Sequence, residues 1–185
     1  MRLKLILLDF DGTLADTREA NASAYVAALQ EAGYRMDKET YLKHYFGMRC
    51  PEFLRSVGFT DPAQIDRIRR RKIELYPSFF STVRLNEPLW EFCRQFRRTG
   101  GRVWIVSTGQ ADNIRNAMRH LHLEGEVDGV LTADEVEHNK PAPDAFLKAM
   151  EIEGCQPGET LIFEDSAVGV EAARRSGAPY VVVRL

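Results

Sequence analysis

The sequence predicts an α/β fold, namely a parallel sheet with helices on both faces and an all-helical segment inserted after the first strand. Two observations carry this prediction. Short continuous apolar runs alternate with helical stretches, as expected for strands that are buried on both faces. One long stretch without a good strand interrupts this alternation near the start of the chain. The 185 residues suffice for one core domain and a small insertion.

The first predicted strand is Leu5–Leu8, because four successive apolar residues lead directly into a polar turn. Similar apolar runs predict further strands at Val103–Val106, Val127–Leu131, Thr160–Phe163 and Tyr180–Val183. The stretches between them predict helices at Asn86–Arg98, Ala111–His120, Pro143–Glu151 and Ala167–Ser176. Glycines at the ends of these helices, such as Gly100 and Gly177, are typical of C-terminal caps.

The stretch that interrupts the alternation predicts helices and no strands. We expect them near Thr17–Ala32, Asp37–Phe46, Pro51–Val57 and Pro62–Tyr76. Thr17 supplies a plausible N-cap for the first helix and Gly33 a plausible stop. The expected division is therefore a core of residues 1–15 and 83–185 and a helical cap of residues 16–82.

Composition and charge exclude several classes of protein. The net charge of -2 provides no basic field for nucleic acid or a membrane surface. The apolar runs are far shorter than the roughly 20 residues that cross a bilayer. The chain shows no signal-peptide pattern, and its three cysteines match no metal-ligand spacing, so a cytoplasmic protein with reduced, buried thiols is expected.

Polar side chains follow the predicted strands where each strand ends. In chain order they are Asp9 and Asp11, then Ser107 and Thr108, then Lys140 beyond the third core strand, then Glu164 and Asp165. The carboxyl ends of parallel strands meet at one edge of an open sheet, where ligands bind. A fold needs none of these groups there, so we expect a functional site at this edge.

The residue types indicate phosphate chemistry with a hard cation. Four carboxylates close together are costly unless a cation neutralises them. Oxygen ligands without a cluster of histidines or cysteines favour Mg²⁺ over zinc. Lys140 and Ser107 are suitable donors to phosphoryl oxygens. The segment Asp9–Thr13 alone also fits a simple turn, but the other polar strand ends disfavour that alternative.

Four segments in order resemble the motifs of the haloacid dehalogenase superfamily, in its phosphatase-like branch with a small helical cap. They are Asp9–Leu14, Ile105–Ser107, Lys140–Pro143 and Phe163–Gly169. The resemblance implies a Rossmann-like core like that of phosphoglycolate phosphatase and beta-phosphoglucomutase. One departure is Asn139, where many relatives have glycine, and asparagine also tolerates a left-handed turn.

The resemblance also implies roles for single residues. Asp9 would be the nucleophile that forms an aspartyl-phosphate, and Asp11 the general acid and base. Ser107 and Lys140 would hold the phosphoryl group, with Thr108 beside them. Asp9, Asp165, Glu164 and the backbone carbonyl of Asp11 would hold Mg²⁺. Arg49, in a turn like the loop of related caps that faces the active site, would contact an anionic substrate.

The function expected from these roles is a Mg²⁺-dependent phosphatase of a small phosphorylated metabolite, acting as a monomer or homodimer. Asp11 disfavours dehalogenation, because dehalogenases proper lack this second aspartate. The alternative is a phosphomutase of the beta-phosphoglucomutase type, which Asn21 disfavours because mutases typically carry histidine near there. Less favoured are a phosphonate-cleaving enzyme, which would need a cap lysine such as Lys38 or Lys43, and a non-catalytic phosphate-binding protein.

Overall fold

The computed structural model describes residues 2–185, which form two compact units. The first unit combines the chain up to Asp16 with Arg84–Leu185, and the second is Thr17–Val83. The first unit contains the sheet, so a short N-terminal segment and the whole C-terminal part of the chain build it together.

The sheet of the first unit has five parallel strands. In spatial order they are β5 (Gly129–Leu131), β4 (Arg102–Val106), β1 (Leu5–Leu8), β6 (Thr160–Glu164) and β7 (Tyr180–Val182). The central strand is β1, in which Leu5 lies opposite both Arg102 and Thr160. The α/β prediction is therefore confirmed, and each of the five strands of this sheet lies where an apolar run predicted one.

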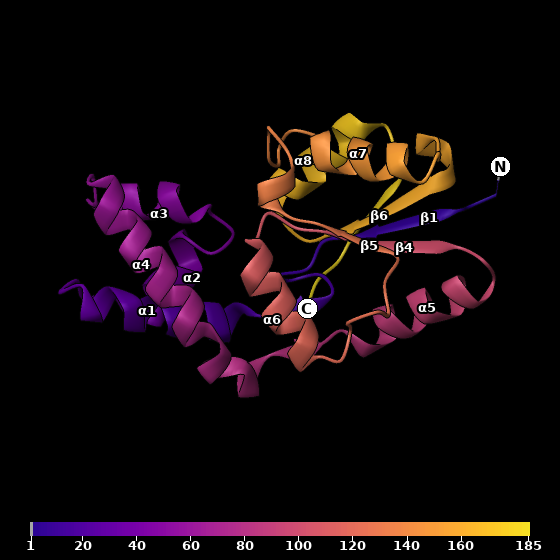
Figure 1. The fold of residues 1–185 in the computed structure, drawn as a ribbon. Helices are drawn as coiled ribbons and strands as arrows, with labels where there is room; N and C mark the ends of the chain where they lie inside the picture. The colour runs from indigo at the N-terminus through magenta and orange to yellow at the C-terminus, as the bar shows by residue number, and fades with distance from the viewer. Residues whose placement is uncertain (1) are drawn as a thin grey trace. The chain divides into compact units, whose positions relative to one another are not determined.

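Four helices cover the sheet on its two faces (Figure 1). They are α5 (Glu87–Arg98), α6 (Ala111–His120), α7 (Asp144–Ile152) and α8 (Ala167–Ser176). In Figure 1, α7 and α8 lie on one face, while α5 and α6 lie on the other. Two 3₁₀ turns, Ala133–Glu135 and Pro157–Glu159, precede α7 and β6. A two-residue antiparallel pair, β2 (Ala15–Asp16) and β3 (Arg84–Leu85), was not predicted.

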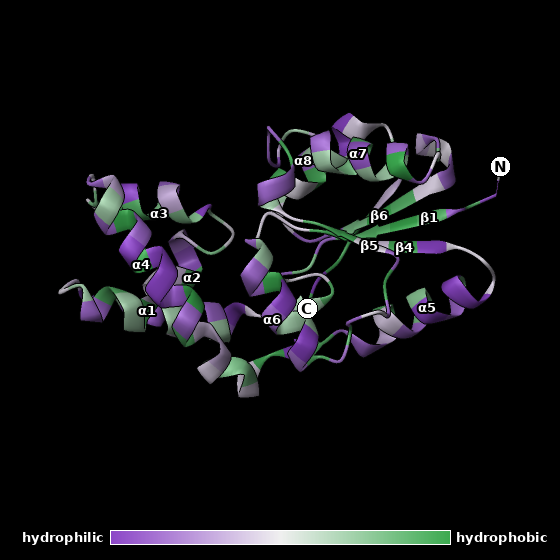
Figure 2. Ribbon diagram, in the orientation of Figure 1, coloured by the Kyte–Doolittle hydropathy of each residue, from purple (hydrophilic) through white to green (hydrophobic). Residues whose placement is uncertain are grey.

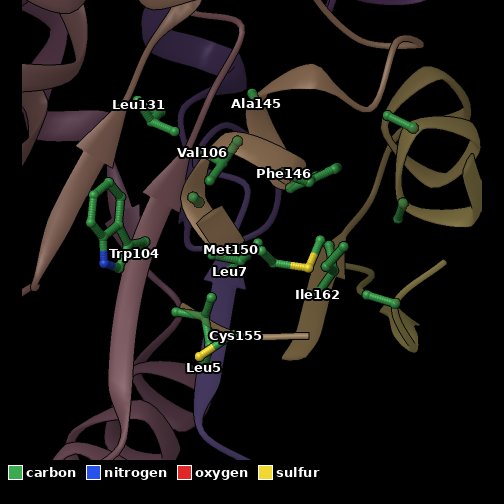
Figure 3. Close-up of a cluster of buried hydrophobic side chains, with 14 residues drawn as sticks. Leu5, Leu7, Trp104, Val106, Leu131, Ala145, Phe146, Met150, Cys155 and Ile162 are labelled. Carbon is green, nitrogen blue, oxygen red and sulfur yellow. The ribbon is translucent and has the colours of Figure 1, made fainter. Parts of the chain in front are cut away.

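The strands are apolar along most of their length, as the green colour of β1 in Figure 2 shows. All four side chains of β1 have no exposed surface. Figure 3 shows the core between the sheet and helices α7 and α8, where Leu5 and Leu7 pack near Phe146 and Ile162. Because side chains alternate along a strand, Ile6 and Leu8 face the opposite side. This double burial holds the end of β1 in place.

The second unit consists of α1 (Arg18–Glu31), α2 (Lys38–His44), α3 (Cys50–Ser56), α4 (Pro62–Leu75) and the 3₁₀ helix Tyr76–Thr82. Its core holds an aromatic cluster in which the ring centroid of Phe53 lies 5.1 Å from Tyr25 and 5.3 Å from Tyr41. Asp37 and Asp61 cap α2 and α4 through backbone N–H groups. Thr17 is the N-cap residue of α1 but makes no side-chain cap; its hydroxyl instead accepts a hydrogen bond from Asn21.

Within residues 2–185, no helix has both the length and the apolar character needed to span a membrane. The three cysteines are free thiols. Cys93 and Cys155 are buried as expected, whereas Cys50 is only half-buried because it opens α3 at the edge of the helical unit's core.

Candidate active site

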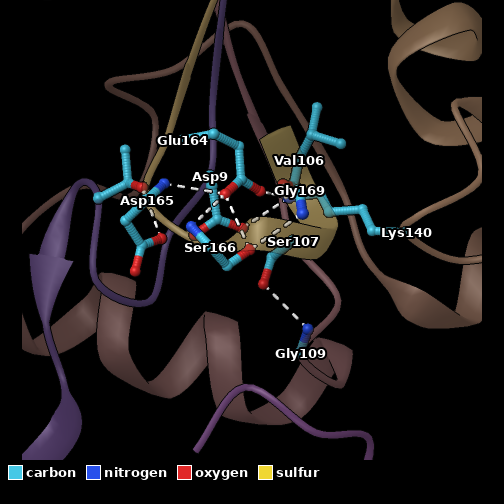
Figure 4. A network of polar contacts seen from close by, with 10 residues as sticks. Asp9, Val106, Ser107, Gly109, Lys140, Glu164, Asp165, Ser166 and Gly169 are labelled. Atoms are coloured by element: carbon cyan, nitrogen blue, oxygen red, sulfur yellow. Dashed lines mark hydrogen bonds and ion pairs between the residues drawn. The ribbon is translucent and has the colours of Figure 1, made fainter. Parts of the chain in front are cut away.

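Five of the predicted polar residues gather where the central strands end (Figure 4), namely Asp9, Ser107, Lys140, Glu164 and Asp165. Asp9 directly follows β1, Ser107 directly follows β4, and Glu164 is the last residue of β6. The Asp9 N–H donates to the carbonyl of Phe163 at 3.0 Å, and the Ser107 N–H donates to the carbonyl of Leu131 at 2.9 Å. The backbone of each residue is thus fixed by the neighbouring strand before its side chain meets the site.

Lys140 is the centre of the polar network. It is 9% exposed, and its Nζ lies 2.6 Å from Asp9 Oδ1 and 2.7 Å from Glu164 Oε1. A third hydrogen bond of 2.8 Å goes to the carbonyl of Val106. A protonated lysine has three donors, and all three are used by these acceptors. The lysine predicted to bind a phosphoryl group therefore also ties together the ends of β1, β4 and β6.

Burial and charge together set the proton affinities of this network. Burial raises the pKa of Asp9 well above its ordinary value, and the positive charge of Lys140 offsets this only in part. Burial lowers the pKa of Lys140, but the charges of Asp9 and Glu164 outweigh it, so that this pKa is raised. Burial and the charge of Glu164 also raise the pKa of Asp165. The carboxyl edge of the sheet thus holds three carboxyl groups, Asp9, Glu164 and Asp165, around a single lysine.

Glu164 is fully buried and its two oxygens have different partners. Oε1 accepts from Lys140, while Oε2 accepts from the Asp165 N–H at 2.9 Å, the Ser166 N–H at 3.0 Å and the Ser166 hydroxyl at 3.0 Å. Ser166 is also the N-cap of α8, where its Oγ accepts from the Gly169 N–H at 3.0 Å. A Cβ on Gly169 would lie 1.8 Å from Glu164 Oε1, so only glycine fits there.

Asp165 lies against the turn that follows β1. The hydroxyl of Thr13 donates to Asp165 Oδ1 at 3.0 Å. Gly12 has a φ of +94°, and a Cβ built on it would lie 2.3 Å from Asp165 Oδ2. Both the left-handed backbone and the close approach require glycine at this position. The glycine after Asp11 thus makes room for the carboxylate that follows β6.

The arrangement of these carboxylates fits a hard divalent cation. Asp9, Glu164 and Asp165 each offer an oxygen within 4.8 Å of the others. The raised pKa values of Asp9 and Asp165 indicate carboxylates that are desolvated and crowded, which a cation would relieve. Carboxylate oxygens without nitrogen or sulfur ligands suit Mg²⁺.

The remaining predicted residues occupy different positions. Asp11 is half-buried in the turn after Asp9. The backbone of Asp11 forms an isolated β-bridge with Ala15. The Ser107 hydroxyl accepts from the Gly109 N–H at 2.9 Å, and Thr108 lies half-buried between them in the chain. Arg49 belongs to the helical unit, where it precedes α3 and lies 3.9 Å from Glu52. Its contact with a substrate remains a prediction.

Two features of the site differ from or go beyond the sequence reasoning. Among the described residues the non-glycine with a left-handed backbone is His122, so Asn139 does not use the left-handed conformation that asparagine tolerates. Its side chain instead donates to the carbonyl of Ala133 at 3.3 Å. The contacts of Thr13 and Ser166 were not foreseen. A serine directly before a predicted helix is an N-cap signal, and this could have singled out Ser166.

Open α/β sheets bind their ligands at the carboxyl ends of the strands, which is where the carboxylates and the buried lysine of this chain lie. The chain matches the model of the haloacid dehalogenase-like hydrolase family over residues 6–183. It therefore belongs to this family, as the resemblance of its four motifs implied.

Relatives with assigned names agree with this placement. The chain is 31% identical to fructose-1-phosphate phosphatase YqaB of Escherichia coli, over 97% of this chain and 96% of that protein. It is 25% identical to pyrophosphatase PpaX of Bacillus mycoides, over 99% of this chain and 84% of that protein. The solved structure of CbbY from Rhodobacter sphaeroides with phosphate has the same fold, with a TM-score of 0.89 at 24% identity, covering 99% of this chain and 87% of that one. The protein is a phosphatase of small phosphorylated substrates.

Proposed function

We propose that the protein is a Mg²⁺-dependent phosphatase that hydrolyses a small phosphorylated metabolite through an aspartyl-phosphate on Asp9. The observation that carries the proposal is the contact of Lys140 with both Asp9 and Glu164, beside Asp165, at the carboxyl edge of the sheet. This contact supports the proposal because it sets the carboxylate that we propose as nucleophile next to a fixed positive charge.

Asp9, Asp165 and Glu164 would hold the metal, together with the backbone carbonyl of Asp11. When bound, Mg²⁺ supplies positive charge that lets an anionic carboxylate approach an anionic phosphate. Lys140 acts in the same direction, because its ammonium group is fixed 2.6 Å from Asp9 before any substrate arrives.

The proposed reaction has two displacements. In the first, an oxygen of Asp9 attacks phosphorus, the bond from phosphorus to the ester oxygen breaks, and Asp11 gives that oxygen a proton. In the second, water attacks the phosphorus of the aspartyl-phosphate, Asp11 takes a proton from the water, and the bond from phosphorus to the Asp9 oxygen breaks, which releases phosphate and restores the Asp9 carboxylate. Ser107 holds the phosphoryl oxygens together with Lys140, whose ammonium charge attracts them, and Thr108 lies beside Ser107 in the chain.

The substrate's remaining part is proposed to be selected by the helical unit, Thr17–Val83, acting as a cap. Arg49 is the proposed contact for an anionic group of the substrate. The name of YqaB points to sugar phosphates as the first class to test. Asn21, at the position that disfavours a mutase, hydrogen-bonds within the helical unit to Thr17, Lys72 and Tyr76.

Phosphorus NMR on the purified protein with Mg²⁺ and a pool of phosphorylated metabolites tests the proposal. We expect the signal of free phosphate to grow while one substrate signal shrinks, and we expect a chelator to stop this. A new phosphomonoester signal without free phosphate would instead identify a mutase. Phosphate release that continues after chelation would contradict the metal dependence.

Metal binding is expected to weaken as the pH falls. The pKa values of Asp9 and Asp165 are raised, so protons compete with Mg²⁺ for these carboxylates in mildly acidic solution. We expect Mg²⁺ to raise the unfolding temperature more at about pH 8 than at about pH 5. Differential scanning calorimetry with MgCl₂ and with a chelator measures this, and Asp165→Asn should reduce the shift. An equal shift at both pH values would contradict the assignment of these ligands.

A further inference from the structure

We propose that Ser166 is a positioning residue for the reaction, which acts on Lys140 through the carboxylate of Glu164. This inference rests on the proposed function, since it concerns the same site. The residues form one continuous chain of hydrogen bonds (Figure 4), from Gly169 to Ser166, Glu164, Lys140 and finally Asp9.

The direction of each hydrogen bond is determined by the groups involved. The Gly169 N–H donates to Ser166 Oγ, so the hydroxyl proton of Ser166 is directed toward Glu164 Oε2. Lys140 can only donate, so Glu164 Oε1 must accept from it. The start of α8 therefore determines which oxygen of Glu164 faces the lysine.

Ser166 supplies the hydrogen bond to Glu164 Oε2 that a side-chain substitution can remove. Oε2 accepts three hydrogen bonds, of which two come from the backbone N–H groups of Asp165 and Ser166 and persist in any variant. The third comes from the Ser166 hydroxyl. Because Glu164 is fully buried, no solvent replaces a lost donor at low cost. Without the hydroxyl, Oε2 keeps only its two backbone donors, so the carboxylate is held less firmly and so is Lys140 beside Asp9.

Three substitutions separate this role from helix capping. Ser166→Gly removes the hydroxyl at an N-cap position where glycine is well tolerated, whereas Ser166→Ala removes both the hydroxyl and the favourable cap. Ser166→Thr keeps both. Asp61→Gly, at the N-cap of α4 in the helical unit, is the matched control for losing a cap elsewhere.

The kinetic test uses p-nitrophenyl phosphate and Mg²⁺ with the full chain. We expect Ser166→Gly to lower kcat about ten-fold with KM nearly unchanged, because a lost hydrogen bond to a charged group acts on the transition state. Ser166→Thr should retain wild-type kcat, and Asp61→Gly should as well. A Ser166→Gly enzyme with wild-type kcat would overturn the inference, as would an equal loss in Asp61→Gly.

A second readout does not depend on turnover. Proton–nitrogen NMR of the lysine ammonium groups should show a protected signal for buried Lys140, assigned by its loss in Lys140→Met. We expect this signal to shift or broaden in Ser166→Gly and to persist in Ser166→Thr and Asp61→Gly. An unchanged signal in Ser166→Gly overturns the inference whether or not the enzyme turns over. A wild-type protein without phosphatase activity would refute the proposed function, while the NMR result would still decide the link between Ser166 and Lys140.

Discussion

Asp9→Asn is expected to lower the rate of phosphate release by at least about 1,000-fold, because the amide cannot act as the nucleophile that forms the acyl-phosphate. The side chain keeps its shape, and Lys140 keeps its hydrogen bonds to Glu164 and to the carbonyl of Val106. The fold should therefore survive, with an unfolding temperature within about 5 °C of the wild type. Phosphate release and calorimetry on the same preparation measure both quantities.

The matched control is Asp112→Asn on α6. Asp112 is exposed, and its contact is with Arg115 at 3.4 Å, outside the polar network. This variant should retain full activity. Substantial turnover by Asp9→Asn would exclude Asp9 as the nucleophile and would require another group to attack phosphorus.

Lys140→Met is expected to reduce both activity and stability. It leaves the buried carboxylates of Asp9 and Glu164 without their shared cation, which should cost about 3–5 kcal/mol of unfolding free energy. We also expect kcat to fall about 100- to 1,000-fold, since a preorganised charge at the reacting carboxylate is lost.

The stability loss in Lys140→Met should depend on pH with a definite sign. The pKa of Asp9 is already raised by burial, and removal of the lysine charge should raise it further. The folded variant then binds a proton more readily than the unfolded chain, so its stability should decline as the pH rises. Urea unfolding at about pH 5 and about pH 8 tests this, with a larger loss expected at the higher pH. Lys148→Met is the control, because Lys148 is exposed and donates to the carbonyl of Glu135. A loss that is independent of pH would argue against the proposed charge pairing.

The sheet and its helices could be predicted because their signals are local. Continuous apolar runs marked the strands, and α6 and α8 span the predicted residues. The strand expected at Val127–Leu131 is shorter, because the Asp128 carboxylate turns to bind Arg97 and the Val103 N–H, and β5 begins at Gly129. The pair of β2 and β3 joins segments far apart in the chain, and two residues carry no periodic signal.

In the site, too, local features could be predicted from the sequence, whereas contacts between distant segments could not. The strand-end rule predicted which side chains would meet at the edge, because parallel strands leave little freedom about where their ends lie. It could not predict that Lys140 would bind Asp9, Glu164 and the carbonyl of Val106 together, because this depends on the path of the loop that carries it. The split between the two oxygens of Glu164 likewise depends on how α8 begins, which only the three-dimensional structure reveals.

The position of β1 has a consequence for biosynthesis. Its partners are Arg102–Ile105 and Thr160–Phe163, so the central strand leaves the ribosome long before β6 has been made. Thr17–Val83 is one unbroken segment, and it can collapse first because its contacts are close in sequence. Until β4 and β6 have been synthesised, β1 has no strand to pair with, and its apolar side chains are not yet buried in the sheet. Nascent chains stalled before residue 160 are therefore the species in which we expect chaperone binding and aggregation.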